Sequence, residues 1–90
     1  MTADLQRLPR QLPGVEVRGD GPEACLVASS TGVELLVNPT ARAIWEQCDG
    51  ITTVDELVSA ICQLFDVSRT TAAADVRQVI EELEQAGLVS

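Results

Sequence analysis

Residues 38–50 read NPTARAIWEQCDG and predict one short helix with both of its ends marked. Asn38 is a good N-cap, and Pro39 suits the first helical position, where no backbone N–H is needed. Four apolar residues recur at the spacing i, i+3, i+4, i+7 and so share one face: Ala41, Ile44, Trp45 and Cys48. Gly50 can adopt the left-handed conformation that closes a helix. Because Trp45 is the only Trp in the chain, we expect it to anchor the core.

The residues that precede this helix favour a small antiparallel sheet. Strand-like runs at 15–18, 24–28 and 33–37 are rich in branched and apolar residues. The segments between them, 19–22 and 29–32, contain the Gly, Pro, Ser and Asp residues that predict short turns. Turns of this length connect neighbouring strands of a meander, so the last run should lie at an edge. That run holds no Pro or Lys to protect the edge, which is therefore either covered or used for pairing.

Two further helices are expected after the first. Thr53 and Glu56 form a capping box, and apolar residues keep one face of the second helix as far as Phe65. Ser68 is a good N-cap for a third helix that continues to about residue 86, and Gly87 ends it. The apolar residues of this third helix recur at helical spacing: Ala72, Ala73, Val76, Val79, Ile80, Leu83 and Ala86.

The third helix begins with small side chains from Thr70 to Ala74. They leave shallow space beside the helix, so this segment forms either a closely packed interface or the wall of a groove. The whole pattern predicts an α+β, winged helix-turn-helix-like domain over residues 14–90, in which a three-stranded antiparallel sheet is followed by three helices. Residues 1–13 contain Pro9 and Pro13, show no period, and predict an extended arm or a frayed terminus.

The composition excludes several classes of function. Six Arg and no Lys stand against 14 acids, which gives a net charge of −8. A chain of this sign is a poor partner for nucleic acid or an anionic membrane. Without His or Lys the usual nucleophile–base pairs cannot form, so we expect no catalysis and no cofactor. The three cysteines, at 25, 48 and 62, lack metal-site spacing and predict buried thiols, and the absence of an export signal predicts a cytoplasmic protein.

A set of short matches, taken in order along the chain, identifies a family. The matches are LVNPTA at 36–41, IW at 44–45, CDG at 48–50, TVDEL at 53–57, ADV at 74–76, Leu83, and AGLV at 86–89. At this spacing and after a three-strand start, the set resembles the PqqD-like family of precursor-peptide-binding domains, also called RiPP recognition elements. The resemblance covers residues 14–89.

The resemblance implies a winged helix-turn-helix that binds peptide and carries out no catalysis. It implies that the leader segment of a ribosomally made precursor adds as a strand to the sheet edge, beside the third helix. The precursor would then pass to a maturation enzyme such as a radical SAM protein, a cyclase or a leader peptidase. The expected peptide-binding residues are Gly32, Val33, Glu34, Leu35, Leu36 and Val37 in the strand, and Arg69, Ala72, Ala73, Val76, Arg77 and Ile80 in the helix. The two Arg could pair with acids in a leader, whereas every apolar residue has core packing as its alternative.

The chain departs from the family pattern at two places. Residues 38–40 stand where members that serve pyrroloquinoline quinone biosynthesis carry an acidic residue, and the third strand lacks the aromatic of many lasso-peptide members. Two other functions also fit the fold. A DNA-binding winged helix is disfavoured because the third helix has two Arg against four acids. A homodimer could form if two third strands paired with each other.

Overall fold

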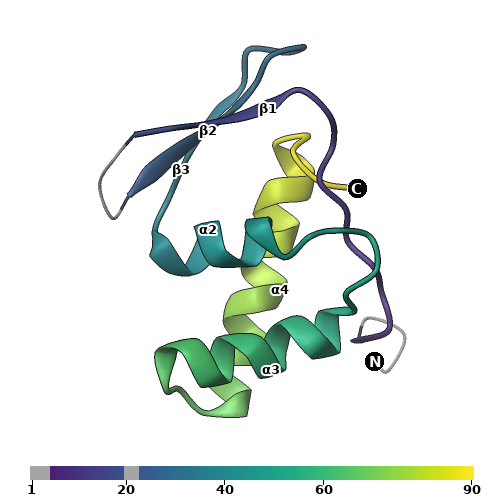
Figure 1. The fold of residues 1–90 in the computed structure, drawn as a ribbon, viewed down its shortest axis with the longest axis vertical. Coiled ribbons are helices and arrows are strands. Elements are labelled where there is room, and N and C mark those ends of the chain that lie inside the picture. Colours follow the sequence, from purple (N-terminus) through teal and green to yellow (C-terminus); the bar gives the residue numbers. More distant parts are fainter. Residues whose placement is uncertain (1–4, 20–22) are drawn as a thin grey trace.

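In a computed structural model, which describes residues 5–19 and 23–90, the chain forms the α+β domain that the sequence predicts. Its elements are β1 (Val15–Arg18), β2 (Ala24–Ala28), β3 (Glu34–Val37), α2 (Pro39–Glu46), α3 (Val54–Phe65) and α4 (Arg69–Gln85). The sheet comes first in the chain and the helices follow it (Figure 1). Part of the turn expected at 19–22 lies outside the described residues.

The sheet is an antiparallel meander in the order β1-β2-β3, so β3 lies at an edge as expected. The register places Leu26 of β2 opposite Leu35 of β3. Successive side chains of a strand point to opposite faces. On β3, Leu35 and Val37 therefore turn toward the helices and are half-buried and buried, whereas Glu34 and Leu36 are exposed on the outer face. One face of the sheet packs on the helices and the other meets solvent.

The core lies between the sheet and the helices, where α4 passes behind both α2 and α3 (Figure 1). It gathers fully buried side chains from the sheet, from each helix and from the segment after α4: Leu26, Ile44, Leu57, Ile61, Leu83 and Leu88. Trp45 is 8% exposed and belongs to this cluster, which agrees with its expected role as an anchor. Helix α4 packs on both α2 and α3, so the face of α4 that carries its buried residues points into the core and its other faces are exposed.

Side-chain caps begin the helices as the sequence predicts. The Oδ1 atom of Asn38 accepts a hydrogen bond from the backbone N–H of Ala41 at 2.8 Å. Thr53 and Glu56 form a complete capping box at the start of α3, and Ser68 caps α4. The cap at Asn38 lies between the last residue of β3 and the first residue of α2, so the strand turns directly into the helix.

The first helix ends earlier than expected, and Gly50 has a different role. α2 stops at Glu46 because the N–H of Cys48 reaches back only three residues, to a carbonyl 3.0 Å away. Gly50 has a φ of +80°, but it lies beyond the helix end. Its N–H donates to the carbonyl of Pro9 at 3.0 Å, and a Cβ at this position would lie 3.2 Å from Cδ of Arg10. This glycine therefore makes room for the N-terminal arm.

From Arg7 to Leu12 the arm is extended as expected, and it is docked, so the expectation of a frayed terminus is wrong for this stretch. Arg10 and Ser90 exchange backbone hydrogen bonds of 3.1 and 2.9 Å, and the N–H of Leu12 donates to Leu88 at 3.0 Å. Pro9 is fully buried. The arm thereby lies against the C-terminal residues and the segment that follows α2.

Candidate functional site

The free edge of β3 is the first feature of the candidate site. The N–H of Ala28 donates to the carbonyl of Val33 at 2.9 Å. Backbone groups alternate in direction along an antiparallel strand, so Leu35 also bonds toward β2. Glu34 and Leu36 must then turn their N–H and C=O groups toward the open side. These groups are available to another extended chain.

A groove of about 220 Å³ runs beside this edge, and we call it the β3–α4 groove. It is lined by Leu35, Leu36 and Val37 of β3, by Asn38, Thr40 and Ala41 at the start of α2, and by Asp75, Gln78, Val79, Glu82 and Leu83 of α4. Residues 75, 78, 79 and 82 follow the spacing i, i+3, i+4, i+7, so they occupy one face of the helix. This face borders the buried stripe of α4.

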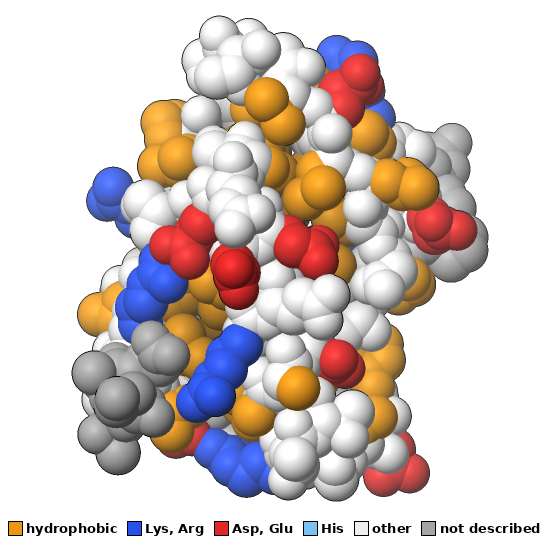
Figure 2. Space-filling model, turned by 180° about the vertical axis from the view of Figure 1, so that it is seen from behind, with side chains coloured by type: hydrophobic (Ala, Val, Ile, Leu, Met, Phe, Trp, Pro, Cys, Tyr) orange, Lys and Arg blue, Asp and Glu red, His pale blue; other side chains and the backbone are white. Residues whose placement is uncertain are grey.

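The floor of the groove is apolar and its rim is acidic. Val37 and Leu83 are buried in the floor, while Val79 is half-buried beside them. Within residues 5–19 and 23–90, neither Asp75 nor Glu82 forms an ion pair, and no Arg lines the groove. Figure 2 views the molecule from the α4 side and shows acidic side chains gathered across the middle of that face. The groove is thus suited to apolar side chains flanked by positive charge.

The structure brings most of the predicted strand residues to this groove. Leu35, Leu36 and Val37 line it directly. Glu34 supplies backbone groups to the edge, but its side chain lies on the outer face, where its Oε1 is 4.0 Å from Sγ of Cys25. Gly32 precedes β3 in the turn and has a φ of +75°. Contact of these residues with a peptide stays a prediction.

The predicted helix residues lie elsewhere. Ala72, Val76 and Ile80 are no more than 4% exposed and belong to the core, and none of them is among the residues that line the groove. Ala73 is partly buried at the core margin. Arg69 pairs with Asp55 of α3, and Arg77 lines a hollow formed with the arm. The continuous apolar stripe of α4 packs into the core. The groove is lined by the neighbouring face of the helix, which carries both polar and apolar side chains.

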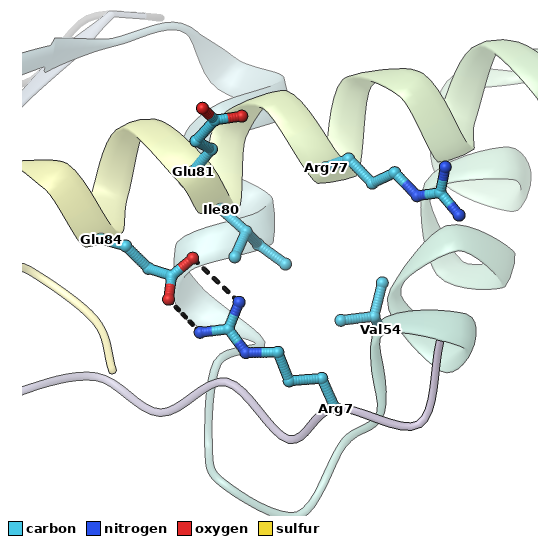
Figure 3. Close-up of a pocket in the computed structure, with 6 residues that line it drawn as sticks. All are labelled: Arg7, Val54, Arg77, Ile80, Glu81 and Glu84. Atoms are coloured by element: carbon cyan, nitrogen blue, oxygen red, sulfur yellow. Dashed lines mark hydrogen bonds and ion pairs between the residues drawn. The ribbon is translucent and has the colours of Figure 1, made fainter. Parts of the chain in front are cut away.

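That second hollow, which we call the arm-side hollow, has a volume of about 260 Å³. It is lined by Arg7, Val54, Arg77, Ile80, Glu81 and Glu84 (Figure 3). The guanidinium of Arg7 donates two hydrogen bonds to the carboxylate of Glu84, one of them 2.9 Å long. These bonds hold the pKa of Glu84 below its ordinary value, against a smaller opposing effect of burial. The arm is therefore attached to α4 by charge, whereas its backbone hydrogen bonds go to the segment after α2, to the start of α3 and to the residues after α4.

The described residues offer little for catalysis. No group of three or more Cys, Asp or Glu side chains among them could hold a metal ion. Burial raises the pKa of the Cys48 thiol to about 12, with a further contribution from Asp49, so this thiol stays protonated at neutral pH. Cys25 and Cys62 are half-buried, which corrects the expectation that all three thiols are buried.

No helix in the described part of the chain has the length and apolar character needed to cross a membrane.

The order of elements and the open sheet edge define a small α+β domain of winged-helix-like topology. A family model described as "Coenzyme PQQ synthesis protein D (PqqD)" matches residues 23–89, and the chain belongs to this family. The family assignment therefore confirms the resemblance that the sequence motifs indicate. No curated protein matches the chain.

Two solved structures share the fold. One is TbiB1 in complex with the TbiA(beta) leader peptide, which has a TM-score of 0.76 and 23% sequence identity; the match covers 90% of this chain and 94% of that chain. The other is lasso peptide synthetase B1 complexed with the leader peptide, which has a TM-score of 0.69 and 22% sequence identity; the match covers 92% of this chain and 98% of that chain. At this level of identity the likeness extends to the fold.

Proposed function

We propose that this protein is a non-catalytic peptide-binding module that takes up the leader segment of a ribosomally made precursor. The observation that carries the proposal is the edge of β3 beside the β3–α4 groove, which pairs with no other strand in the described part of the chain. An extended peptide that pairs with Glu34 and Leu36 would continue the sheet by one strand. Its alternate side chains would enter the groove between β3 and α4. Membership of the PqqD family and the leader-peptide complexes of both structural neighbours support this proposal.

The energetics of such a complex follow from its two parts. Backbone hydrogen bonds along the edge supply affinity with little dependence on sequence, and the groove supplies selectivity. One added strand with a few filled pockets corresponds to a micromolar to sub-micromolar complex, or about −8 to −9 kcal/mol. The core does not need to open, because the floor residues Val37 and Leu83 already pack in place.

The site that we propose differs from the one expected from the sequence. The proposed site comprises the edge at Glu34–Val37 and the α4 face formed by Asp75, Gln78, Val79 and Glu82. Gly32 and Val33 extend the edge at its start. Among the helix residues first expected, Ala72, Val76 and Ile80 would act indirectly, by holding α4 at its distance from β3.

We further propose that the bound precursor is presented in the cytoplasm to a maturation enzyme. A radical SAM protein, a cyclase and a leader peptidase are the candidate classes. The part of the precursor that is to be modified would extend beyond the edge strand and remain accessible. The outer face of the sheet, where Leu36 is 67% exposed, is free for contact with such an enzyme.

A backbone amide NMR titration with leader peptides encoded beside the gene tests the proposal. We expect shifts at residues 32–37 and 75–82, and none in the arm at 5–13. A peptide that binds tightly but shifts only the arm-side hollow would contradict strand addition. Self-association through β3 that no peptide disrupts would instead favour the homodimer. A salt-dependent complex with duplex DNA would favour the regulator, although the four acids of α4 oppose it.

A further inference from the structure

We propose that the segment bound in the β3–α4 groove is basic as well as apolar. One apolar side chain lies against Val79 and Leu35, and a Lys or Arg on the same face of the peptide lies beside Asp75 or Glu82. The inference rests on the proposed function, because it specifies the chemistry of the peptide that pairs with β3. It also reverses the sequence-based expectation that Arg69 and Arg77 pair with acids in the leader.

The spacing of the groove residues fits the spacing of a strand. Side chains on one face of an extended peptide recur about every 6.6–6.8 Å. Along α4, Asp75 and Glu82 are seven residues apart, or roughly 10 Å along the helix axis, with Val79 between them. A peptide whose apolar residue contacts Val79 therefore has its next same-face side chains, two or four positions away, within reach of a carboxylate. Lys and Arg are long enough to cover the remaining distance.

The charges around the groove are of one sign. The lining contains two carboxylates and no cation, and Gln78 only donates an amide hydrogen bond to Glu82, at 3.2 Å. Four of the arginines that the structure describes are paired with other acids: Arg7 with Glu84, Arg18 with Glu16, Arg42 with Glu46, and Arg69 with Asp55. Arg77 lines the arm-side hollow. An acidic peptide in the groove would meet only repulsion from Asp75 and Glu82, whereas a basic one gains two partners.

A selection from a phage-displayed library of random twelve-residue peptides provides the first test. Wild-type protein should enrich sequences that combine an apolar residue with Lys or Arg two or four positions away. The variant Glu82→Lys should lose that enrichment or favour acids. The neighbouring variant Glu81→Lys is the matched control, because it changes the net charge equally but lies on the arm-side hollow. It should leave the enrichment as in the wild type.

The second test measures affinity for one selected peptide and for a copy with Gln in place of its basic residue. By fluorescence anisotropy we expect the copy to bind about two- to five-fold more weakly for each charge removed. The difference should shrink at high salt, because the pairs are partly exposed. The variant Asp75→Asn should also reduce this difference in affinity between the two peptides. Circular dichroism should show that the variant keeps the wild-type fold.

The outcomes separate this inference from the proposed function. If selected peptides shift the β3 amides but show no basic preference, the charge inference is wrong and strand addition stands. If Glu81→Lys changes the preference as much as Glu82→Lys, the effect comes from the net charge of −8 rather than from the groove, and the inference is again wrong. If no selected peptide shifts β3 at all, the proposed function fails, and the inference fails with it.

Discussion

Helix α4 has a hollow on each side, and the two hollows differ in whether a segment of the same chain lies in them. In the arm-side hollow, Arg7 from an extended segment of the same chain is paired with Glu84 (Figure 3). In the β3–α4 groove, Asp75 and Glu82 face no cation among the described residues, and β3 keeps one side of its backbone unpaired. One hollow already holds an extended segment, and the other is open to one.

The difference shows what a docked segment contributes in this fold. The arm makes backbone hydrogen bonds to Cys48 and Leu88, 2.8 and 3.0 Å long, and buries Pro9. The β3 edge offers the same kinds of contact, namely free backbone groups, an apolar floor and flanking charge. A guest strand could therefore be held by the same kinds of interaction that hold the arm, including a basic side chain of the segment beside an acidic side chain of α4.

The largest expected effect comes from the core that both hollows share. Leu83 of α4 is fully buried and also forms part of the groove floor. The change Leu83→Ala should lower the free energy of unfolding by about 3 kcal/mol, from lost burial and the cavity left behind. Urea denaturation measures this loss. A change below about 1 kcal/mol would mean that α4 does not depend on this contact.

The next effect concerns binding and applies to the groove side alone. In Leu36→Pro the missing N–H belongs to the free edge, so the β2–β3 ladder keeps its hydrogen bonds while an added strand loses one. We expect peptide affinity to fall about ten-fold or more, with little change in thermal stability. Isothermal titration calorimetry with a selected peptide measures the loss of affinity.

The matched control for this variant is Val17→Pro on the opposite edge of the sheet. Gly14 and Ser29 share a 2.9 Å backbone bond, so by alternation Val17 also points its N–H away from β2. This variant should bind peptide as the wild type does. Equal losses in both variants would show that the peptide does not distinguish the two edges.

A smaller effect on binding is expected from the apolar contact in the groove. Val79→Ser should weaken peptide binding about five-fold, because part of one apolar contact is lost. Arg77→Ser, two residues earlier on the same helix, lines the arm-side hollow and should leave binding unchanged. Parallel titrations of the two variants give the comparison. A larger loss for Arg77→Ser would place the peptide on the wrong side of α4 for our proposal.

The smallest effect is that of the arm-side ion pair on stability. A double-mutant cycle with Arg7→Ala and Glu84→Gln should give a coupling of about 0.5–1 kcal/mol, since both side chains are partly exposed. The pKa of Glu84 is lower in the folded state, so its contribution is present above the ordinary value of 4.5 and is lost as the pH falls through the folded-state pKa.

Thermal melts over this pH range measure the effect. The stability difference between wild type and Glu84→Gln should therefore narrow below about pH 4.5. A difference that stays constant with pH would show that the pair contributes packing rather than charge.

Local rules in the sequence predicted the fold closely. The runs at 15–18 and 24–28 are β1 and β2, and the caps at Asn38, Thr53 and Ser68 begin the helices as expected. These features depend on neighbouring residues, so they can be read without knowledge of tertiary contacts. The early end of α2 at Glu46 was missed, because residues 47–49 carry no Gly or Pro that would mark the end of the helix before Gly50.

The site was predicted in part. The exposed edge at β3 follows from strand order and the absence of protecting residues, and the structure confirms that position. The groove face of α4 was missed because periodicity marks Ala72, Val76 and Ile80 as one apolar stripe without showing that this stripe is the core. The available signal was Val79, an apolar residue flanked by Asp75, Gln78 and Glu82 at helical spacing. The docked arm had a weaker signal, its apolar Leu5, Pro9 and Leu12.

The pairing of Arg10 with Ser90 has a consequence for the connectivity of the chain. These bonds bring the arm and the C-terminal residues side by side, on the side of the molecule away from β3 (Figure 1). The arm before Arg10 continues to the start of α3, where the carbonyl of Arg7 accepts a hydrogen bond of 2.9 Å from the N–H of Val54, so the first described residues of the chain lie apart from its C-terminal end (Figure 1). An enzyme domain fused after Ser90 would lie on the side away from β3 and leave the β3 edge open, so that binding and chemistry could be combined in a single polypeptide.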